Sequence, residues 1–171
     1  MREIKINSTD GSEIVLVATA KDYMRVSSTV DDNIITRMIT QARIWCENYI
    51  SRDIVAKTRT YYLPETNGIF DLPFGPVSSI TSVKSDDVDI AYTVLGLNSE
   101  SIELDGGYAD KVKIVYVTSG LNDELLQSAI MQLVSTYYDN RADFSSDQKS
   151  NVESIPTNVR DILNSYKAMY L

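Results

Sequence analysis

Two clusters of carboxylates are the residues of this sequence whose type and spacing could support chemistry. Asp31 is adjacent to Asp32, and Asp86, Asp87 and Asp89 form a second group. Paired carboxylates can act as general acid and base or bind Ca²⁺ or Mg²⁺. Neither group has the glycine and the distal glutamate of an EF-hand loop. We therefore expect a helix cap at the first group and a solvent-exposed turn at the second.

The sequence gives little support to nucleophilic or imidazole chemistry. It contains no histidine and one cysteine, Cys46. These counts exclude histidine-dependent triads, an intramolecular disulfide and cysteine-cluster metal sites. Cys46 falls in an apolar helical stripe, so we expect a buried, unreactive thiol. We expect no enzyme activity, no cofactor and no metal.

Composition limits the class of protein. The chain has 171 residues, of which 43% are hydrophobic and 23% charged, as in a packed domain, and we expect a single domain over residues 1–171. The net charge of -8 disfavours non-specific DNA binding by its surface. No apolar run approaches the length that spans a bilayer, so we expect no membrane association.

Apolar periodicity predicts the helices that would position these residues. A stripe predicts a long helix from Asp31 to Ser51. Start signals predict three more: one from Thr19 through Met24, one capped by Asn122, and a last one capped by Thr157. Between the last two, residues 142–154 are polar and are expected to form a loop. The long helix's stripe is Ile34, Ile35, Met38, Ile39, Ala42, Trp45, Cys46, Tyr49 and Ile50.

Alternating residues predict the strands. The first seventeen residues, with a turn at Asp10-Gly11, predict a β-hairpin extension. About six short strands are expected between residues 54 and 119, at 58–63, 69–72, 80–83, 90–94, 102–104 and 111–117. The expected fold class is therefore α+β, a bundle of about four helices with an antiparallel β meander inserted between the second and third. Its segments are a hairpin (1–17), helices (18–53), a β insertion (54–119) and C-terminal helices (120–171).

The distribution of acidic residues and tyrosines indicates which segments could lie at a surface that contacts another molecule. Residues 84–110 hold seven acids and one lysine, which is -6 of the total -8. Such a segment either protects the edges of a sheet or repels an anionic partner. Eleven tyrosines stand against three phenylalanines, and tyrosine is common at association surfaces. Tyr137, Tyr138, Tyr166 and Tyr170 are candidates for an interface, the alternative being that they pack within the chain.

Several motifs, taken in order, resemble one known family. They are TAKDYMRV at 19–26, DDNIITRMI at 31–39, ARIWCENYISR at 42–52, LPFGPVSSITSV at 72–83, VYVTSG at 115–120 and YYDNR at 137–141. Together they resemble the head–tail connector proteins of tailed bacteriophages, also called adaptor or head-completion proteins. The resemblance runs from about residue 18 to the C-terminus.

The resemblance implies a structural virion protein of the neck, assembled in the host cytoplasm. Family members form a ring, commonly of twelve copies, beneath the portal, and the ring joins the DNA-filled capsid to the tail and lines the DNA exit channel. The implied partners are other copies of the chain, the portal protein, a stopper or tail-completion protein, and DNA only in passage. The implied interface residues are Tyr137, Tyr138, Arg141, Tyr166, Tyr170 and Leu171. The alternative is a soluble α+β module that binds a protein or ligand and has no part in virion assembly.

Overall fold

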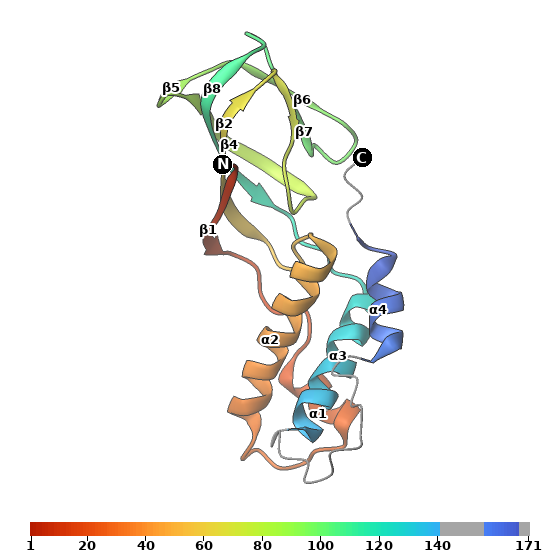
Figure 1. Ribbon diagram of the computed structural model, residues 1–171. Helices are drawn as coiled ribbons and strands as arrows, with labels where there is room; N and C mark the ends of the chain where they lie inside the picture. Colours follow the sequence, from red (N-terminus) through yellow and green to blue (C-terminus); the bar gives the residue numbers. More distant parts are fainter. Residues whose placement is uncertain (141–155, 168–171) are drawn as a thin grey trace. The chain divides into compact units, whose positions relative to one another are not determined.

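The computed structural model describes residues 1–140 and 156–167, which fold into two compact units (Figure 1). The β unit comprises Met1–Ser12 and Ser51–Leu121, and the helical unit comprises Glu13–Ile50 and Asn122–Leu171. These boundaries lie close to those predicted at residues 54 and 120. The prediction that the whole chain is a single domain stays a prediction.

The described residues contain four helices and eight strands, and all strands except the first lie between the second and third helices. Every strand pair is antiparallel. The predicted α+β class and the β insertion are therefore confirmed. The elements are β1 (Glu3–Thr9), α1 (Val17–Met24), α2 (Asp32–Ile50), β2 (Lys57–Thr66), β3 (Ile69–Asp71), β4 (Val77–Ser85), β5 (Val88–Asp89), β6 (Tyr92–Leu95), β7 (Ser101–Leu104), β8 (Ala109–Thr118), α3 (Glu124–Asp139) and α4 (Thr157–Asn164).

The strands form two sheets rather than one sequential meander. The larger sheet has the order β1-β2-β8-β4-β5, and the smaller has the order β3-β7-β6. The long strand β8 pairs with both β2 and β4, so the last strand of the chain occupies the middle of the larger sheet. The predicted strand at 90–94 corresponds to β6, which begins two residues later at Tyr92, and the short strand β5 precedes it.

The core of the β unit follows from the alternation of its long strands. Successive side chains of a strand point to opposite faces, and in β2 the residues alternate between buried and partly exposed. One face of β2, β4 and β8 packs on the buried side of β7. The buried core residues are Tyr61, Leu63, Leu72, Val77, Val83, Ile102, Leu104, Val112, Ile114 and Tyr116.

The predicted N-terminal hairpin over residues 1–17 is wrong. Strand β1 pairs with β2, with Ile4 opposite Tyr61, and Ile14–Val17 is not a strand. The amides of Asp10 and Gly11 both donate to the carbonyl of Ala56, so the turn dipeptide leads the chain away from β1 instead of returning it. The segment Ile14–Val17 does not form the second strand of a hairpin, because Val15 is buried in the core of the helical unit and Val17 is the first residue of α1.

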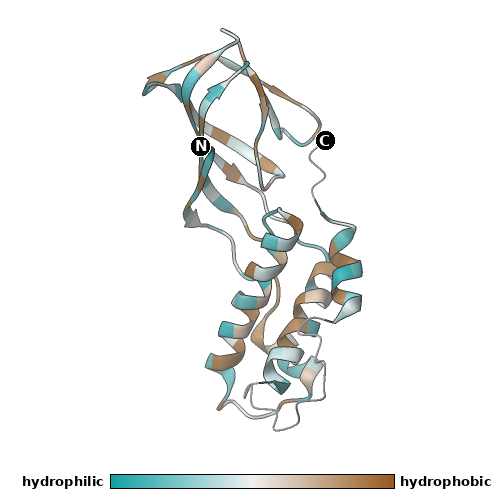
Figure 2. Cartoon of the chain, in the orientation of Figure 1, coloured by the Kyte–Doolittle hydropathy of each residue, from teal (hydrophilic) through white to brown (hydrophobic). Residues whose placement is uncertain are grey.

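The helical unit is built around α2, as its apolar stripe predicts (Figure 2). Helix α2 spans Asp32–Ile50 and packs against α1, α3 and α4. A buried ion-pair chain fixes the segment before α1 to it, because Arg43 donates to Glu13 at 2.7 Å and to Glu47 at 2.8 Å. Thr40 also donates to Glu13.

The predicted helix starts are shifted by a few residues. Helix α1 begins at Val17, so Thr19 lies inside it and caps nothing. The cap of α3 is Asp123 rather than Asn122, because the Asp123 carboxylate accepts the amide of Leu125. Pro156 precedes α4, and Thr157 is its first helical residue. Helix α4 ends at Asn164, and the polar segment predicted at 142–154 lies outside the described residues.

Candidate assembly surfaces

A second stripe of side chains runs along α2, opposite to its buried face. Ile34 and Ile44 are 41% and 45% exposed, although both are large and apolar. The spacing alternates between three and four residues, which is how one helix packs along another. Sequence periodicity assigned Ile34 to the buried stripe, and the structure corrects this. The stripe is Ile34, Arg37, Gln41, Ile44 and Asn48.

The middle of this stripe is a shallow groove. It has a volume of about 380 Å³ and is lined by Thr36, Arg37, Thr40, Gln41 and Ile44. The exposed isoleucine beside threonine and glutamine side chains gives it an apolar floor with few charges. The sequence signal that could have found it is Ile44, an apolar residue among polar positions.

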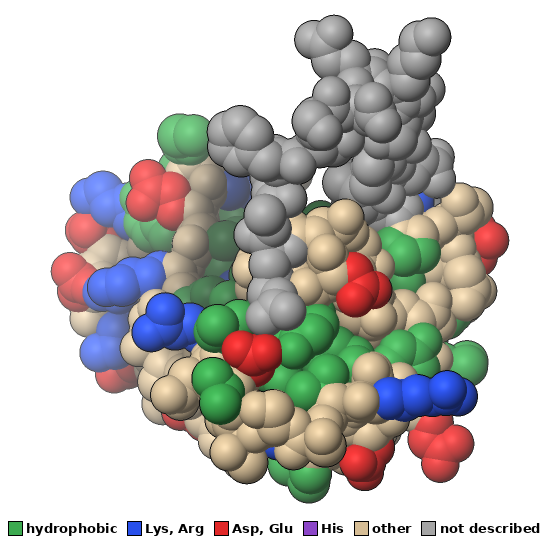
Figure 3. Space-filling model, turned by 90° about the horizontal axis from the view of Figure 1, so that it is seen from below, with side chains coloured by type: hydrophobic (Ala, Val, Ile, Leu, Met, Phe, Trp, Pro, Cys, Tyr) green, Lys and Arg blue, Asp and Glu red, His purple; other side chains and the backbone are tan. Residues whose placement is uncertain are grey.

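Hydrophobic side chains also reach the surface at the end of the helical unit that carries α1. Figure 3 shows them gathered near the centre of the visible face, with most charged side chains toward its periphery. Exposed apolar residues of this unit include Leu16, Tyr23 and Val30. Contiguous exposed apolar surface commonly marks a site of protein association.

Three of the six predicted interface residues lie in the described part of the chain, all in the helical unit. Tyr137, Tyr138 and Tyr166 are each partly buried. The Tyr138 hydroxyl donates to Asp31 at 2.6 Å, and the Tyr166 hydroxyl donates to the cap residue Asp123. The other predicted residues, Arg141, Tyr170 and Leu171, lie outside the described residues.

These contacts also define the electrostatics of the tyrosines. Two effects raise the pKa of Tyr166 to about 12: the larger is the loss of solvation, and the second is the hydrogen bond to Asp123. Burial similarly raises the pKa of Tyr137. In return, the hydrogen bond from Tyr166 lowers the pKa of Asp123. Neither tyrosine is therefore prepared to ionise and act as a base at neutral pH.

The first carboxylate cluster lies at the start of α2, where the expected helix cap stays a prediction, and the second forms the turn expected of it. Asp32 lies in the first turn of α2 and pairs with Lys21 at 2.7 Å, while Asp31 accepts from Tyr138. Asp86 and Asp87 form the turn between β4 and β5, with φ angles of 47° and 64°. Positive φ at both central residues is typical of a tight hairpin turn and is tolerated by aspartate.

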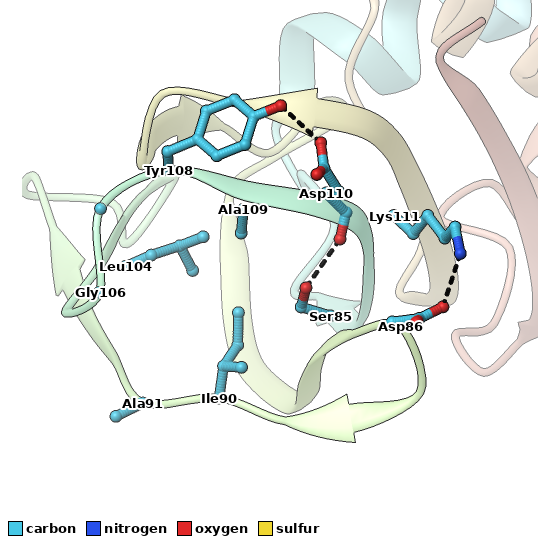
Figure 4. A pocket seen from close by; sticks show the side chains of 11 residues that line it. Ser85, Asp86, Ile90, Ala91, Leu104, Gly106, Tyr108, Ala109, Asp110 and Lys111 are labelled. Atoms are coloured by element: carbon cyan, nitrogen blue, oxygen red, sulfur yellow. Dashed lines mark hydrogen bonds and ion pairs between the residues drawn. The ribbon is translucent and has the colours of Figure 1, made fainter.

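A pocket of about 640 Å³ opens in the β unit beside this turn (Figure 4). Ile90, Ala91 and Leu104 give it an apolar floor. Its polar side chains contact one another: Tyr108 donates to Asp110 at 2.6 Å, Ser85 donates to the Asp110 carbonyl at 2.7 Å, and Lys111 pairs with Asp86 at 2.9 Å. This arrangement presents no nucleophile beside a base.

Buried charges in the β unit are also fully paired. Asp53 accepts hydrogen bonds from Lys57, Arg59 and Thr118, and Arg59 lies 3.9 Å from the centre of the Phe74 ring. Burial opposes ionisation of Asp53, but the hydrogen bonds and charges of Arg59 and Lys57 outweigh it and lower its pKa. The cluster holds strand β2 to the segment that precedes it.

The described residues present neither a reactive thiol nor a metal site. Cys46 is buried in the helical core, as expected, and loss of solvation raises its pKa to about 12, which disfavours the reactive thiolate. Within residues 1–140 and 156–167, no group of three or more histidine, cysteine or acidic side chains could hold a metal ion. In the same residues, no helix has both the length and the hydropathy of a membrane span.

Comparison with known proteins shows the family of the chain. The sequence matches the family described as head completion protein over residues 13–169. The chain is a member of the head completion protein family. A search of curated proteins found no match to it.

Solved structures share the fold of this head completion protein. A chain in a structure described as "Neck of empty GTA particle computed with C6 symmetry" is 14% identical, with a TM-score of 0.76 and coverage of 99% of this chain and 97% of that one. A chain in "Neck of native GTA particle computed with C12 symmetry" is 16% identical, with a TM-score of 0.72 and coverage of 99% and 97%. A chain of "Virion of native gene transfer agent (GTA) particle" is 15% identical, with a TM-score of 0.72 and coverage of 98% and 96%.

Family membership confirms the resemblance found in the sequence. The match begins at Glu13, so it leaves β1 outside and includes all four helices. A head completion protein is a structural component of the virion at the junction of head and tail, and its family is not a known class of enzyme. A structural role in the neck implies assembly with other components of the particle.

Proposed function

We propose that this head completion protein forms a ring, of twelve copies, beneath the portal, and that the ring joins the DNA-filled head to the tail and lines the DNA exit channel. Family membership over residues 13–169 supports the proposal. The likeness of the whole fold to chains from necks, one of them computed with twelvefold symmetry, is consistent with it. The location is accordingly the neck of the virion.

The observation that carries the ring is the exposed stripe of α2. Ile34 and Ile44 lie on the outer face of a helix whose other face is already packed. Because less than half of each side chain is still exposed, covering both would stabilise an interface by about 0.6–1.4 kcal/mol each. A neighbouring subunit that covers the groove around Ile44 would repeat the contact around the ring, because a head-to-tail interface closes when its rotation closes.

The portal-facing residues are proposed to be Tyr137, Tyr138 and Tyr166, with Arg141, Tyr170 and Leu171. The hydroxyls of Tyr138 and Tyr166 already bond to Asp31 and Asp123. The portal would therefore contact the exposed parts of the aromatic rings of Tyr138 and Tyr166 and not their hydroxyl groups. The opposite side of the ring would receive a stopper or tail-completion protein.

The charge of the chain suits a channel that DNA passes through without binding. Acidic residues outnumber basic ones by eight, and the excess is concentrated between residues 84 and 110. Surfaces of the same sign as phosphate do not gain the counterion-release term that holds proteins on DNA. We expect no salt-dependent retention of the chain on duplex DNA.

The experiment is assembly with the cognate portal, followed by negative-stain microscopy and sedimentation. We expect rings on the portal with the unaltered chain and no rings with Ile44→Asp. Asn98→Asp, which adds the same charge at an exposed position of the β unit, is the matched control. Failure of the unaltered chain to form rings or bind the portal under any condition would refute the proposal.

A truncation after Ser165 tests the portal contact separately. We expect it to lose portal binding while its circular dichroism stays close to that of the full chain. Portal binding that survives the truncation would show that the C-terminal residues are not the anchor.

A further inference from the structure

The larger sheet of the β unit ends in two strands with an open side. β1 and β5 are the outermost strands in the order β1-β2-β8-β4-β5, and every residue of β1 is exposed. The amide of Ile90 donates to Val83 of β4. Because backbone groups alternate along an antiparallel strand, the amide and carbonyl of Asp89 point to the open edge.

The two edges carry opposite charges. Residues 1–9 include Arg2 and Lys5 against Glu3, for a formal charge of +1, and residues 86–89 include three aspartates, for -3. Lys111 and Lys84 partly neutralise Asp86 and Asp89, at 2.9 and 3.7 Å. Pairing of β5 with β5 would bring like charges together, whereas pairing of β1 with β5 would bring opposite charges together.

The side chains of β1 and β5 are also complementary on both faces of the larger sheet. The register places Lys5 opposite Thr60 and Asp89 opposite Lys84, on the face away from the core. The other face carries Ile4 and Ile6 on β1 and Val88 on β5, which are 38%, 48% and 66% exposed. A β1 strand placed beside β5 would thus put lysine near aspartate on one face and isoleucine near valine on the other.

We propose that β1 of one copy of this chain adds to the β5 edge of the next copy, so that the larger sheets continue from subunit to subunit. The occupant of each open edge is therefore a second copy. This inference rests on the proposed ring, and it assigns a subunit contact in the β unit in addition to the stripe of α2. Strand addition of this kind gains main-chain hydrogen bonds together with side-chain contacts.

The two edge strands β1 and β5 can meet in only one relative direction. All neighbouring strands of the larger sheet are antiparallel, so the first and the fifth run in the same direction. A small rotation between neighbouring subunits leaves strand direction nearly unchanged. The added β1 strand is therefore parallel to β5, and the two edges meet head to tail and not symmetrically.

Cross-linking tests the contact directly. The chain's single natural thiol, Cys46, is buried, so we expect the cross-linker to react only with the introduced cysteines. Ile6→Cys and Val88→Cys proteins are mixed, assembled on the portal and treated with a short bis-maleimide. We expect a dimer that joins one variant to the other, and little dimer from either variant alone. Equal yields of mixed and unmixed dimers from intact rings would overturn the proposal.

Charge reversal gives a second readout that does not depend on cysteine. Lys5→Glu and Asp89→Lys should each weaken ring assembly several-fold, and the double variant should recover it. Lys113→Glu is the matched control, because it makes the same change on the outer face of the central strand β8 and should leave assembly unchanged. Single reversals that assemble like the unaltered chain would also overturn the proposal, and would instead assign the charges to protecting the edges.

These outcomes separate the two proposals. Rings that form without the mixed cross-link and without sensitivity to charge reversal would refute strand addition and leave the ring intact. Absence of rings with the unaltered chain would refute the ring itself.

Discussion

Arg59 donates two hydrogen bonds to the carboxylate of Asp53, at 2.7 and 2.6 Å, inside the β unit. Both side chains are almost completely buried. Paired donors in this geometry give a charge-assisted contact that is stronger than one between neutral groups. A buried charge lowers the stability of the fold when its partner is removed. We therefore expect the free energy of unfolding to depend strongly on this pair.

Replacing Asp53 with Asn should destabilise the chain by about 3–5 kcal/mol, because it removes the carboxylate that pairs with the buried guanidinium of Arg59. Denaturant unfolding followed by circular dichroism measures the loss. Asp71→Asn, which neutralises an exposed carboxylate, is the control and should change stability by less than about 0.5 kcal/mol. A loss at Asp53 as small as that at Asp71 would contradict the assigned role.

The same carboxylate predicts a pH dependence. The folded-state pKa of Asp53 lies below its ordinary value of 3.8, so the stabilisation is present above that value and is lost as the pH falls through the folded-state pKa. The free energy of unfolding should therefore fall with acid below about pH 4. In Asp53→Asn the decline should be shallower. Parallel declines in the two proteins would show that other groups account for it.

Gly120 should tolerate no side chain. Its φ is +75°, and a Cβ there would lie 2.7 Å from the Ile54 carbonyl oxygen. Gly120→Ala should lower stability by about 1–3 kcal/mol. Gly106→Ala is the control, since a Cβ at that position meets nothing within 4 Å. Thermal unfolding compares the two variants, and equal melting temperatures would show that the close approach at Gly120 costs nothing.

The two faces of α2 should respond differently to truncation. Ile39 is buried, so Ile39→Ala should cost about 2–5 kcal/mol of unfolding free energy. Ile44 is exposed in the isolated chain, so Ile44→Ala should cost less than about 1 kcal/mol. The order of effects should reverse in portal-dependent assembly, where Ile44 is proposed to lie at the contact between subunits. A large loss of chain stability from Ile44→Ala would place it in the core instead.

Tyr166 should ionise late. With a pKa of about 12, its hydroxyl stays protonated while ordinary tyrosines titrate near 10. An ultraviolet phenolate titration should therefore lose a late-titrating group in Tyr166→Phe. Asp123→Asn should shift that group toward the ordinary range because it removes the carboxylate that the hydroxyl contacts. An unchanged titration in both variants would show that the hydrogen bond is not formed in solution.

The sequence predicted elements best where one face of an element is buried over its whole length. The stripe containing Ile39, Ala42 and Cys46 located α2 to within one residue at each end. The hairpin at 1–17 failed because the partner of Ile4 is Tyr61, far along the chain, and local turn signals carry no information about such pairing. Asp10-Gly11 is indeed a bend, but one that bonds to Ala56.

The candidate surfaces were only partly predictable. Clusters of like residues, such as Asp86-Asp87, are visible in the sequence and their turn was predicted. The buried charges at Asp53, Lys57 and Arg59 were not, because their neighbours in space include Thr118 from the far end of the β unit. Ile34 shows the same limit, since periodicity does not tell a packed face from an exposed edge of the stripe.

The central position of β8 has a consequence for how the chain is made. A ribosome releases β1, β2, β4 and β5 before it releases the strand that β2 and β4 both need as a partner. Until β8 has emerged, the hydrophobic faces of those strands lack their central partner, and such exposed faces make partly folded chains prone to aggregate. The larger sheet can therefore be completed only after Thr118, the last residue of β8, has left the ribosome.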